Sequence, residues 1–124
     1  MKPVVVNGKV WQVLQVAPDD PLLIDRIGSL RLATTDPDTR TIRISRSVIP
    51  PLLDMVMLHE ATHAITISYG LTDSLRALMT WDLQVFMEEW SAELLEKHGI
   101  EAAVIASRAL GRPVCIRGFC LPWE

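Results

Sequence analysis

The chain has 124 residues, of which 49% are hydrophobic and 22% charged, and its net charge is −3. This composition is typical of one folded domain and excludes an intrinsically disordered chain. The 12 lysines and arginines are scattered along the sequence. A nucleic-acid-binding protein concentrates its basic residues on one surface, so we expect no nucleic-acid partner.

The N-terminus argues against export. The apolar run Val4–Val6 is short and is followed directly by Asn7-Gly8, whereas a signal peptide needs a longer apolar stretch. No segment has the roughly 20 consecutive apolar residues of a membrane-spanning helix. We therefore expect a cytoplasmic protein without a membrane partner, in which Cys115 and Cys120 are reduced thiols.

Two β-hairpins are predicted in the first part of the chain. Residues 3–16 are rich in valine, and Asn7-Gly8 between them is a strong signal for a type I′ turn. Residues 29–45 form the second hairpin, with turn residues at 36–38 and alternating isoleucines in the return strand. Residues 22–27 are ambiguous and fit a short helical turn. The alternation predicts a sheet with one buried face.

A helix is predicted after residue 47, where the hydrophobic period changes. Pro50 and Pro51 suit the first turn of a helix, and Gly70 suits the position just after its end. Between them, the following side chains recur at three- and four-residue spacing: Leu52, Leu53, Val56, His59, Glu60, His63, Ala64 and Ile67.

Two further helices are predicted in the second half of the chain. One begins at residue 72 or 73 and stops at Gly99, and a break would fit at residues 81–82. The other spans residues 101–110 and is ended by the glycine and proline of residues 111–113. The remaining tail is expected to be irregular or a short strand.

His59, Glu60 and His63 form an HExxH pattern in the middle of the first predicted helix. Residues four apart lie on one face of a helix, so the two imidazoles can bind one metal ion. Glu60 lies about 100° around the helix, where it can take a proton from a metal-activated water. The alternative is an accidental cluster on a surface helix, but the rest of this helix is too apolar for an exposed element.

The motif and its flanks match the general zinc-metallopeptidase signature from Val56 to Ile65. More broadly, residues 28–95 resemble small phage and bacterial metallopeptidases related to the ImmA/IrrE group and the minimal gluzincins. The shared pattern is a glycine, a hairpin ending in alternating isoleucines (here Ile42 and Ile44), the HExxH helix and a following helix with a glutamate. This resemblance implies a zincin-like domain, a bound Zn²⁺ ion and hydrolysis of peptide bonds.

A catalytic zinc ion needs a third protein ligand. A metzincin would have a histidine at the position of Tyr69, so that pattern fails, and Tyr69 is expected to pack instead. The similarity to gluzincins implies a glutamate on the next helix in an ExxS or ExxA context. Glu88 fits ExxS and is the preferred ligand, Glu89 fits ExxA, and Glu93 is a further alternative.

Histidines that bind a metal also need hydrogen-bond acceptors for their second ring nitrogens. Many gluzincins have an acidic residue four positions after the third ligand, where this chain has Ala92. Asp54, Asp73 and Asp82 are candidates to replace it. His98 lies at the C-terminus of the predicted helix, where a cation is favourable, and it is left out of the site.

The sequence therefore predicts a single zincin-like α+β domain over residues 1–124. A small, mostly antiparallel sheet is expected to pack on the HExxH helix and on a following helix that carries a glutamate. Zn²⁺ would be bound by His59, His63 and Glu88, and Glu60 would be the general base. The expected function is a zinc metallopeptidase, and the expected partner is a peptide or protein substrate.

Two other hypotheses stay open. One is a binding or regulatory module on the same scaffold, with a structural zinc ion or none. In that case a fourth ligand such as Cys120 could close the metal site. The other, which is weaker, is an interaction protein without a metal. Neither the substrate nor the oligomeric state can be predicted.

Overall fold

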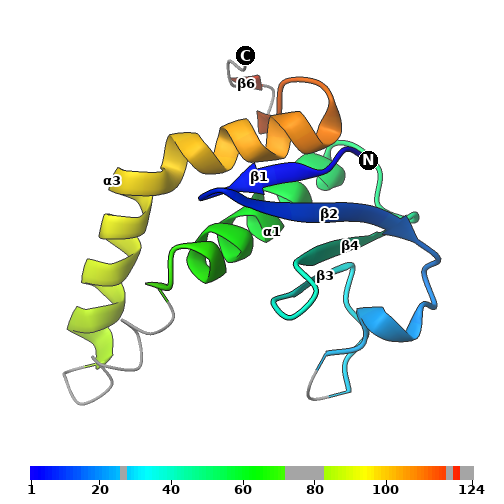
Figure 1. Ribbon diagram of the computed structural model, residues 1–124, viewed down its shortest axis with the longest axis horizontal. Helices are drawn as coiled ribbons and strands as arrows, with labels where there is room; N and C mark the ends of the chain where they lie inside the picture. Colours follow the sequence, from blue (N-terminus) through cyan, green and yellow to red (C-terminus); the bar gives the residue numbers. More distant parts are fainter. Residues whose placement is uncertain (26–27, 72–82, 117–118, 121–124) are drawn as a thin grey trace.

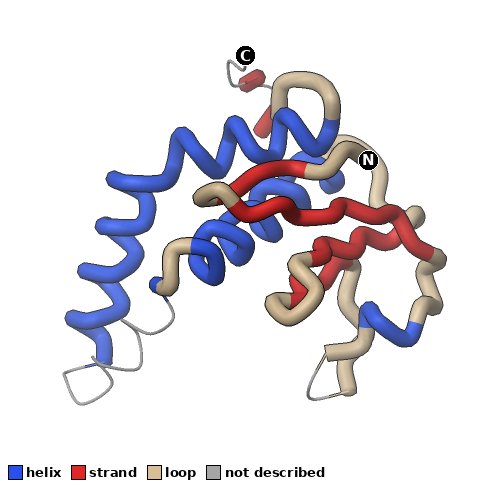
Figure 2. Tube along the Cα trace, in the orientation of Figure 1, coloured by secondary structure: helices blue, strands red, loops and turns tan. Residues whose placement is uncertain are grey.

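The computed structural model describes residues 1–25, 28–71, 83–116 and 119–120. A four-stranded β-sheet is packed against two long helices (Figure 1, Figure 2). The protein therefore has the α+β fold that the sequence predicts. No helix in the described ranges is both long enough and apolar enough to cross a bilayer.

The sheet has the strand order β1-β2-β4-β3. Its strands are β1 (Val4–Val6), β2 (Lys9–Val16), β3 (Ala33–Asp36) and β4 (Thr41–Ser45). The two predicted hairpins, β1–β2 and β3–β4, are confirmed, whereas β2 and β4 in the centre run parallel. Asn7 and Gly8 have φ angles of 49° and 74°, as a type I′ turn requires. The sheet is therefore mixed, because its two antiparallel hairpins associate through parallel strands.

Residues 17–32 connect β2 to β3, and β3 is an edge strand of the sheet. A single turn of 3₁₀ helix, η1 (Pro21–Leu23), overlaps the start of the ambiguous segment 22–27. After it, Ile24 and Leu30 form an isolated antiparallel bridge. This bridge closes a loop beside the edge strand, next to the candidate site described below.

Helix α1 (Leu52–Ser68) carries the HExxH motif and packs on the sheet. Its buried apolar residues recur at helical spacing and share one core with Ile42 of β4: Leu53, Met57, Ala61, Ala64 and Ile65. Trp11 on β2 donates a hydrogen bond from Nε1 to Ser68 Oγ at 2.8 Å, which ties the end of α1 to the sheet. Gly70 follows the helix with a φ of 69°, so the predicted helix and its end are confirmed. The first turn of the helix begins at Leu52, however, so Pro50 and Pro51 precede that turn rather than form it.

Helix α3 (Leu83–Leu110) corrects the prediction of two separate helices, because it runs through Gly99 without interruption. One glycine costs a helix only about 1 kcal/mol. The burial of Ala102 and Ile105 in the core offsets that cost. Figure 1 shows that α3 is bent and that its second half lies beside β1. The predicted helix start and break fall in residues 72–82, outside the described residues.

The chain after α3 forms a short hairpin. Gly111, with a φ of 74°, ends α3 as predicted. Strands β5 (Cys115–Ile116) and β6 (Phe119–Cys120) then pair antiparallel, with Cys115 opposite Cys120. Cys115 is disulfide-bonded, so the prediction of two reduced thiols is wrong. The hairpin register brings the two cysteine positions close together, which spacing along the sequence did not reveal.

Candidate metal centre

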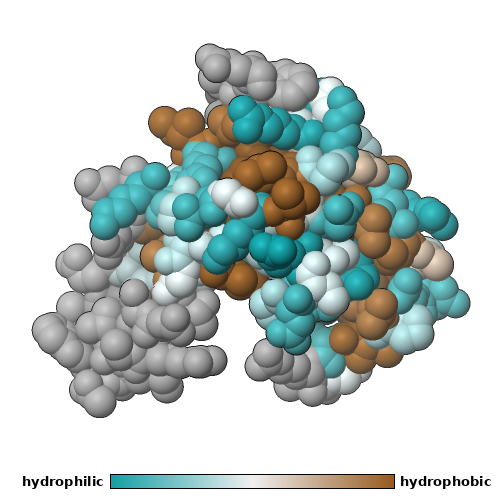
Figure 3. Space-filling view, in the orientation of Figure 1, coloured by the Kyte–Doolittle hydropathy of each residue, from teal (hydrophilic) through white to brown (hydrophobic). Residues whose placement is uncertain are grey.

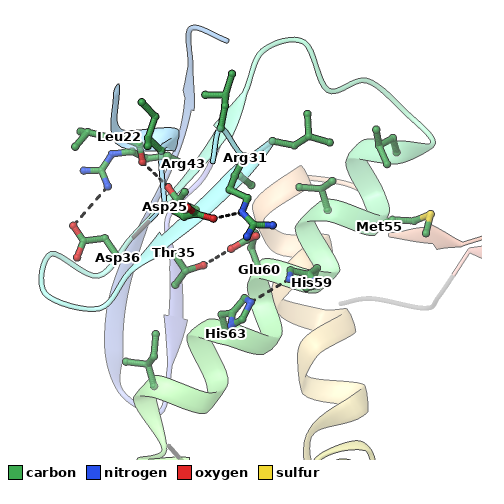
Figure 4. A pocket seen from close by; sticks show the side chains of 18 residues that line it. Leu22, Asp25, Arg31, Thr35, Asp36, Arg43, Met55, His59, Glu60 and His63 are labelled. Atoms are coloured by element: carbon green, nitrogen blue, oxygen red, sulfur yellow. Dashed lines mark hydrogen bonds and ion pairs between the residues drawn. The ribbon is translucent and has the colours of Figure 1, made fainter. Parts of the chain in front are cut away.

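His59 and His63 lie one turn apart on α1 and point to the same side of the helix (Figure 4). Their Nε2 atoms are 3.1 Å apart, and their ring centroids are 4.8 Å apart. Two nitrogens that bind one zinc ion tetrahedrally at their usual bond lengths are about 3.3 Å from each other. The structure thus brings these two predicted residues together at a spacing that fits a shared metal ion.

The surroundings of His63 favour its neutral form. Partial desolvation of the ring on the pocket wall lowers the pKa of His63 below its usual value of 6.5, although the residue remains exposed. The negative charge of Glu60 acts in the opposite direction, and the neighbouring His59 adds to the lowering. Neutral imidazole is the form that binds a metal, since its free ring nitrogen keeps a lone pair for the cation.

Glu60 is buried, with only 6% of its surface exposed, and faces the sheet rather than the solvent. Thr35 on β3 donates a hydrogen bond from Oγ1 to Glu60 Oε2. Thr35 faces the helix because it stands opposite the buried Ile42 in the sheet register. This contact supplies the hydrogen bond that a buried carboxylate needs.

Thr35 is not among the site residues that the sequence predicts. Strand alternation indicates which side of the sheet Thr35 faces, because residues two apart in a strand point the same way. Its partner, however, lies on another element, 25 residues later in the chain. No local pattern identifies that contact.

His59, Glu60 and His63 all line one pocket of about 1070 Å³, between α1 and the segment that leads into β3 (Figure 4). Arg31 points into this pocket, and its Nε donates a hydrogen bond to Asp25 Oδ2 at 2.5 Å. The sequence does not predict this pair either, because the β-bridge between Ile24 and Leu30 brings the two residues together. The motif therefore lies on the wall of a pocket that also contains the guanidinium group of Arg31, hydrogen-bonded to Asp25.

The third metal ligand is not decided by the structure. Within the part of the chain that the structure describes, no three metal-binding side chains come together. Glu88 is carried by the first half of α3, but its side chain lies outside the description, as do those of Glu89 and Glu93. The choice of Glu88 stays a prediction.

Tyr69, which occupies the position of the third histidine ligand in metzincins, contacts two residues of α3. Its hydroxyl donates a hydrogen bond to Glu101 Oε1 at 2.9 Å, which raises the pKa of Tyr69. Its ring lies 4.6 Å from that of His98, whose Nδ1 is 3.0 Å from Glu101 Oε2. Tyr69 thus makes a ring contact, although it remains 38% exposed. His98 lies inside α3 rather than at a helix C-terminus.

The suggestion that Asp54 accepts a hydrogen bond from a metal-bound histidine is wrong. Both of its oxygens accept hydrogen bonds from Arg112, at 2.6 and 2.7 Å. Asp54 comes five residues before His59, so it lies about 140° around the helix, on the side away from the pocket. The other two candidates, Asp73 and Asp82, lie outside the described residues.

The chain was also compared with known proteins. No protein-family model and no curated protein matches it. No solved structure matches it either. The interpretation of the site therefore rests on the HExxH motif and on the geometry of the residues around it.

Proposed function

We propose that the protein is a zinc-dependent metallopeptidase. The observation that carries the proposal is the arrangement on α1, where the Nε2 atoms of His59 and His63 are 3.1 Å apart and the buried Glu60 lines the same pocket. Two imidazoles with an adjacent carboxylate are the ligands and proton acceptor that zinc hydrolases use. Glu88 is the third ligand under this proposal.

The residues would divide the chemistry as follows. Bound zinc would supply a Lewis acid that polarises the peptide carbonyl and acidifies a water molecule. Glu60 would take the proton from that water and pass it to the leaving amide nitrogen. Thr35 occupies Oε2 of Glu60 with its hydrogen bond, which holds the carboxylate in one orientation and leaves Oε1 to take the proton.

The pocket favours a peptide over a small molecule. Its volume of about 1070 Å³ lies just above the range of about 300–1,000 Å³ typical for small ligands. β3 is an edge strand and contributes to the pocket wall. An edge strand can pair with an extended peptide through its outer backbone groups.

Metal analysis and a hydrolysis assay together test the proposal. Protein purified without chelators is expected to contain about one zinc ion per chain and to hydrolyse peptides from a mixed library. Chelation should abolish hydrolysis and lower the melting temperature, because a ligand that binds only the native state at a thousandfold excess over its Kd stabilises by about 4 kcal/mol. Both should return on adding zinc.

His98→Ala is the matched control for His63→Ala. Both variants remove one imidazole, but only His63 lines the pocket. The first should retain zinc and activity and the second should lose both. Zinc-free protein that shows neither a melting shift nor hydrolysis after zinc addition would contradict the proposal.

Zinc affinity should distinguish the candidate third ligands. Glu88→Ala is expected to weaken zinc binding by more than about 100-fold, beyond the loss typical for residues that only support a ligand. Glu89→Ala should have little effect, because adjacent residues lie about 100° apart on a helix. Competition with a chromogenic chelator measures both. The opposite ranking would assign Glu89, and no loss in either variant would point to Glu93 or to another type of ligand.

A further inference from the structure

Exposed apolar side chains gather around the candidate site. Six of the thirteen large apolar residues that are exposed in the described part of the chain line this one pocket, and each is 45–61% exposed. They come from the η1–β3 segment and from the start of α1: Leu22, Ile24, Leu30, Leu32, Leu52 and Met55. Figure 3 shows apolar surface over the η1 segment. Apolar surface gathered in this way is typical of a binding site.

Arg31 places a fixed positive charge in the same pocket. Its side chain is 56% exposed, yet its Nε is hydrogen-bonded to Asp25 Oδ2 at 2.5 Å. Asp25 is in turn oriented by the backbone N–H of Ser29, which donates a hydrogen bond to its Oδ1 at 2.9 Å. Because Asp25 contacts the guanidinium at Nε, the terminal Nη atoms can donate to another group. A guanidinium presented by its Nη atoms suits a carboxylate.

The second arginine of the pocket is placed differently. Arg43 on β4 forms an ion pair with Asp36 on β3, with Nη1 and Oδ2 3.7 Å apart. Neither residue is at a strand position that faces α1, because each is adjacent in its strand to a residue that does, Ile42 or Thr35. Arg31, by contrast, precedes β3 and points into the pocket on the side of Glu60 (Figure 4). Of these two cations, Arg31 is the one placed to meet a group bound beside His59 and Glu60.

We propose that the pocket selects a peptide that carries a carboxylate next to a large apolar side chain. The apolar side chain packs between the leucines and isoleucine that flank β3 on the N-terminal side and the first turn of α1, and Arg31 binds the carboxylate. The flanking residues are Leu22, Ile24, Leu30 and Leu32. The carboxylate can be the C-terminus of the peptide or the side chain of an aspartate. Only the hydrolysis of the bound peptide rests on the proposed function; its selective binding does not.

Binding of fluorescein-labelled hexapeptides, followed by anisotropy, tests the selection without turnover. All proteins carry Glu60→Gln, and each measurement is made with and without zinc. A peptide that ends in leucine with a free carboxylate should bind about tenfold tighter than its C-terminal amide, as expected for a hydrogen-bonded charge pair. An amidated peptide with an internal Leu-Asp pair distinguishes the two carboxylate sources, because it should match the free acid only if a side-chain carboxylate is accepted.

Two variant series assign the residues. Arg31→Gln should remove the preference for a carboxylate, Arg31→Lys should retain part of it, and Arg46→Gln, an exposed arginine outside the pocket, should leave it unchanged. Met55→Ser should weaken binding of the leucine peptide about fivefold, whereas Ile100→Ser, at an 85% exposed position away from the pocket, should not.

The inference is overturned if acid and amide bind equally, or if Arg31→Gln keeps the preference while its melting curve shows that it is folded. Hydrolysis by the wild-type protein is measured separately. Selective binding without hydrolysis would overturn the proposed function and leave the inference intact. Hydrolysis without an Arg31-dependent preference would overturn the inference and leave the proposed function intact.

Discussion

Glu60→Gln is expected to lower kcat for peptide hydrolysis by about 10²–10⁴-fold while the protein keeps its zinc. Glutamine has nearly the same shape as glutamate and can still accept the hydrogen bond from Thr35, so the fold around this buried position should survive. It cannot take up the proton of the attacking water. Metal content and catalysis should therefore separate in this variant.

The measurement combines zinc analysis with kcat and KM for a substrate of the wild-type protein. Glu101→Gln is the matched control, because it makes the same chemical change on α3, where Glu101 bonds to Tyr69 rather than facing the pocket. The control should keep wild-type kcat. Wild-type turnover in Glu60→Gln would show that this carboxylate is not the base. Loss of zinc in the same variant would show that Glu60 helps to hold the metal.

Asp54→Asn is expected to lower the free energy of unfolding by about 3 kcal/mol, the low end for breaking a buried ion pair, and the melting temperature by about 10 °C. Asp54 is 1% exposed and accepts hydrogen bonds from Arg112 and from the Cys115 backbone N–H. The low end applies because the side chain of Arg112 is 39% exposed. This carboxylate joins α1 to the segment that follows α3.

The effect should depend on pH in a defined direction. The Arg112 guanidinium, together with the Cys115 N–H, holds the pKa of Asp54 below its usual value of 3.8. The stabilisation is therefore fully present above that value and is lost as the pH falls through the lowered pKa of the folded state. The difference between wild type and variant should be constant near neutral pH and shrink below about pH 4.

Urea unfolding from pH 7 down to pH 3 measures this difference. Asp38→Asn is the control, since Asp38 is exposed in the β3–β4 turn, and it should change stability by less than about 0.5 kcal/mol. A loss below about 1 kcal/mol in Asp54→Asn would mean that the ion pair contributes little. A difference that grows as the pH falls would contradict the direction of the pKa shift.

Much of the secondary structure could be predicted because its signals are local. The Asn7-Gly8 turn, the alternating Ile42 and Ile44 and the helix before Gly70 each depend on residues that are close in sequence. Gly99 is a position where the local signal gives the wrong prediction. A glycine usually stops a helix when nothing packs against the turn that follows, but here Ala102, Ala103 and Ile105 in the next turn are buried in the core, and the helix continues.

The sequence by itself determined that His59, Glu60 and His63 share a helix, and helical geometry then brings the two imidazoles together. Only the tertiary structure decided what surrounds them. It brings Thr35 to Glu60, Arg31 to the pocket and Arg112 to Asp54. Each of these contacts joins different elements of the fold, and periodicity and turn chemistry act only within one element. Such contacts are decided when the sheet and the helices pack around a common core.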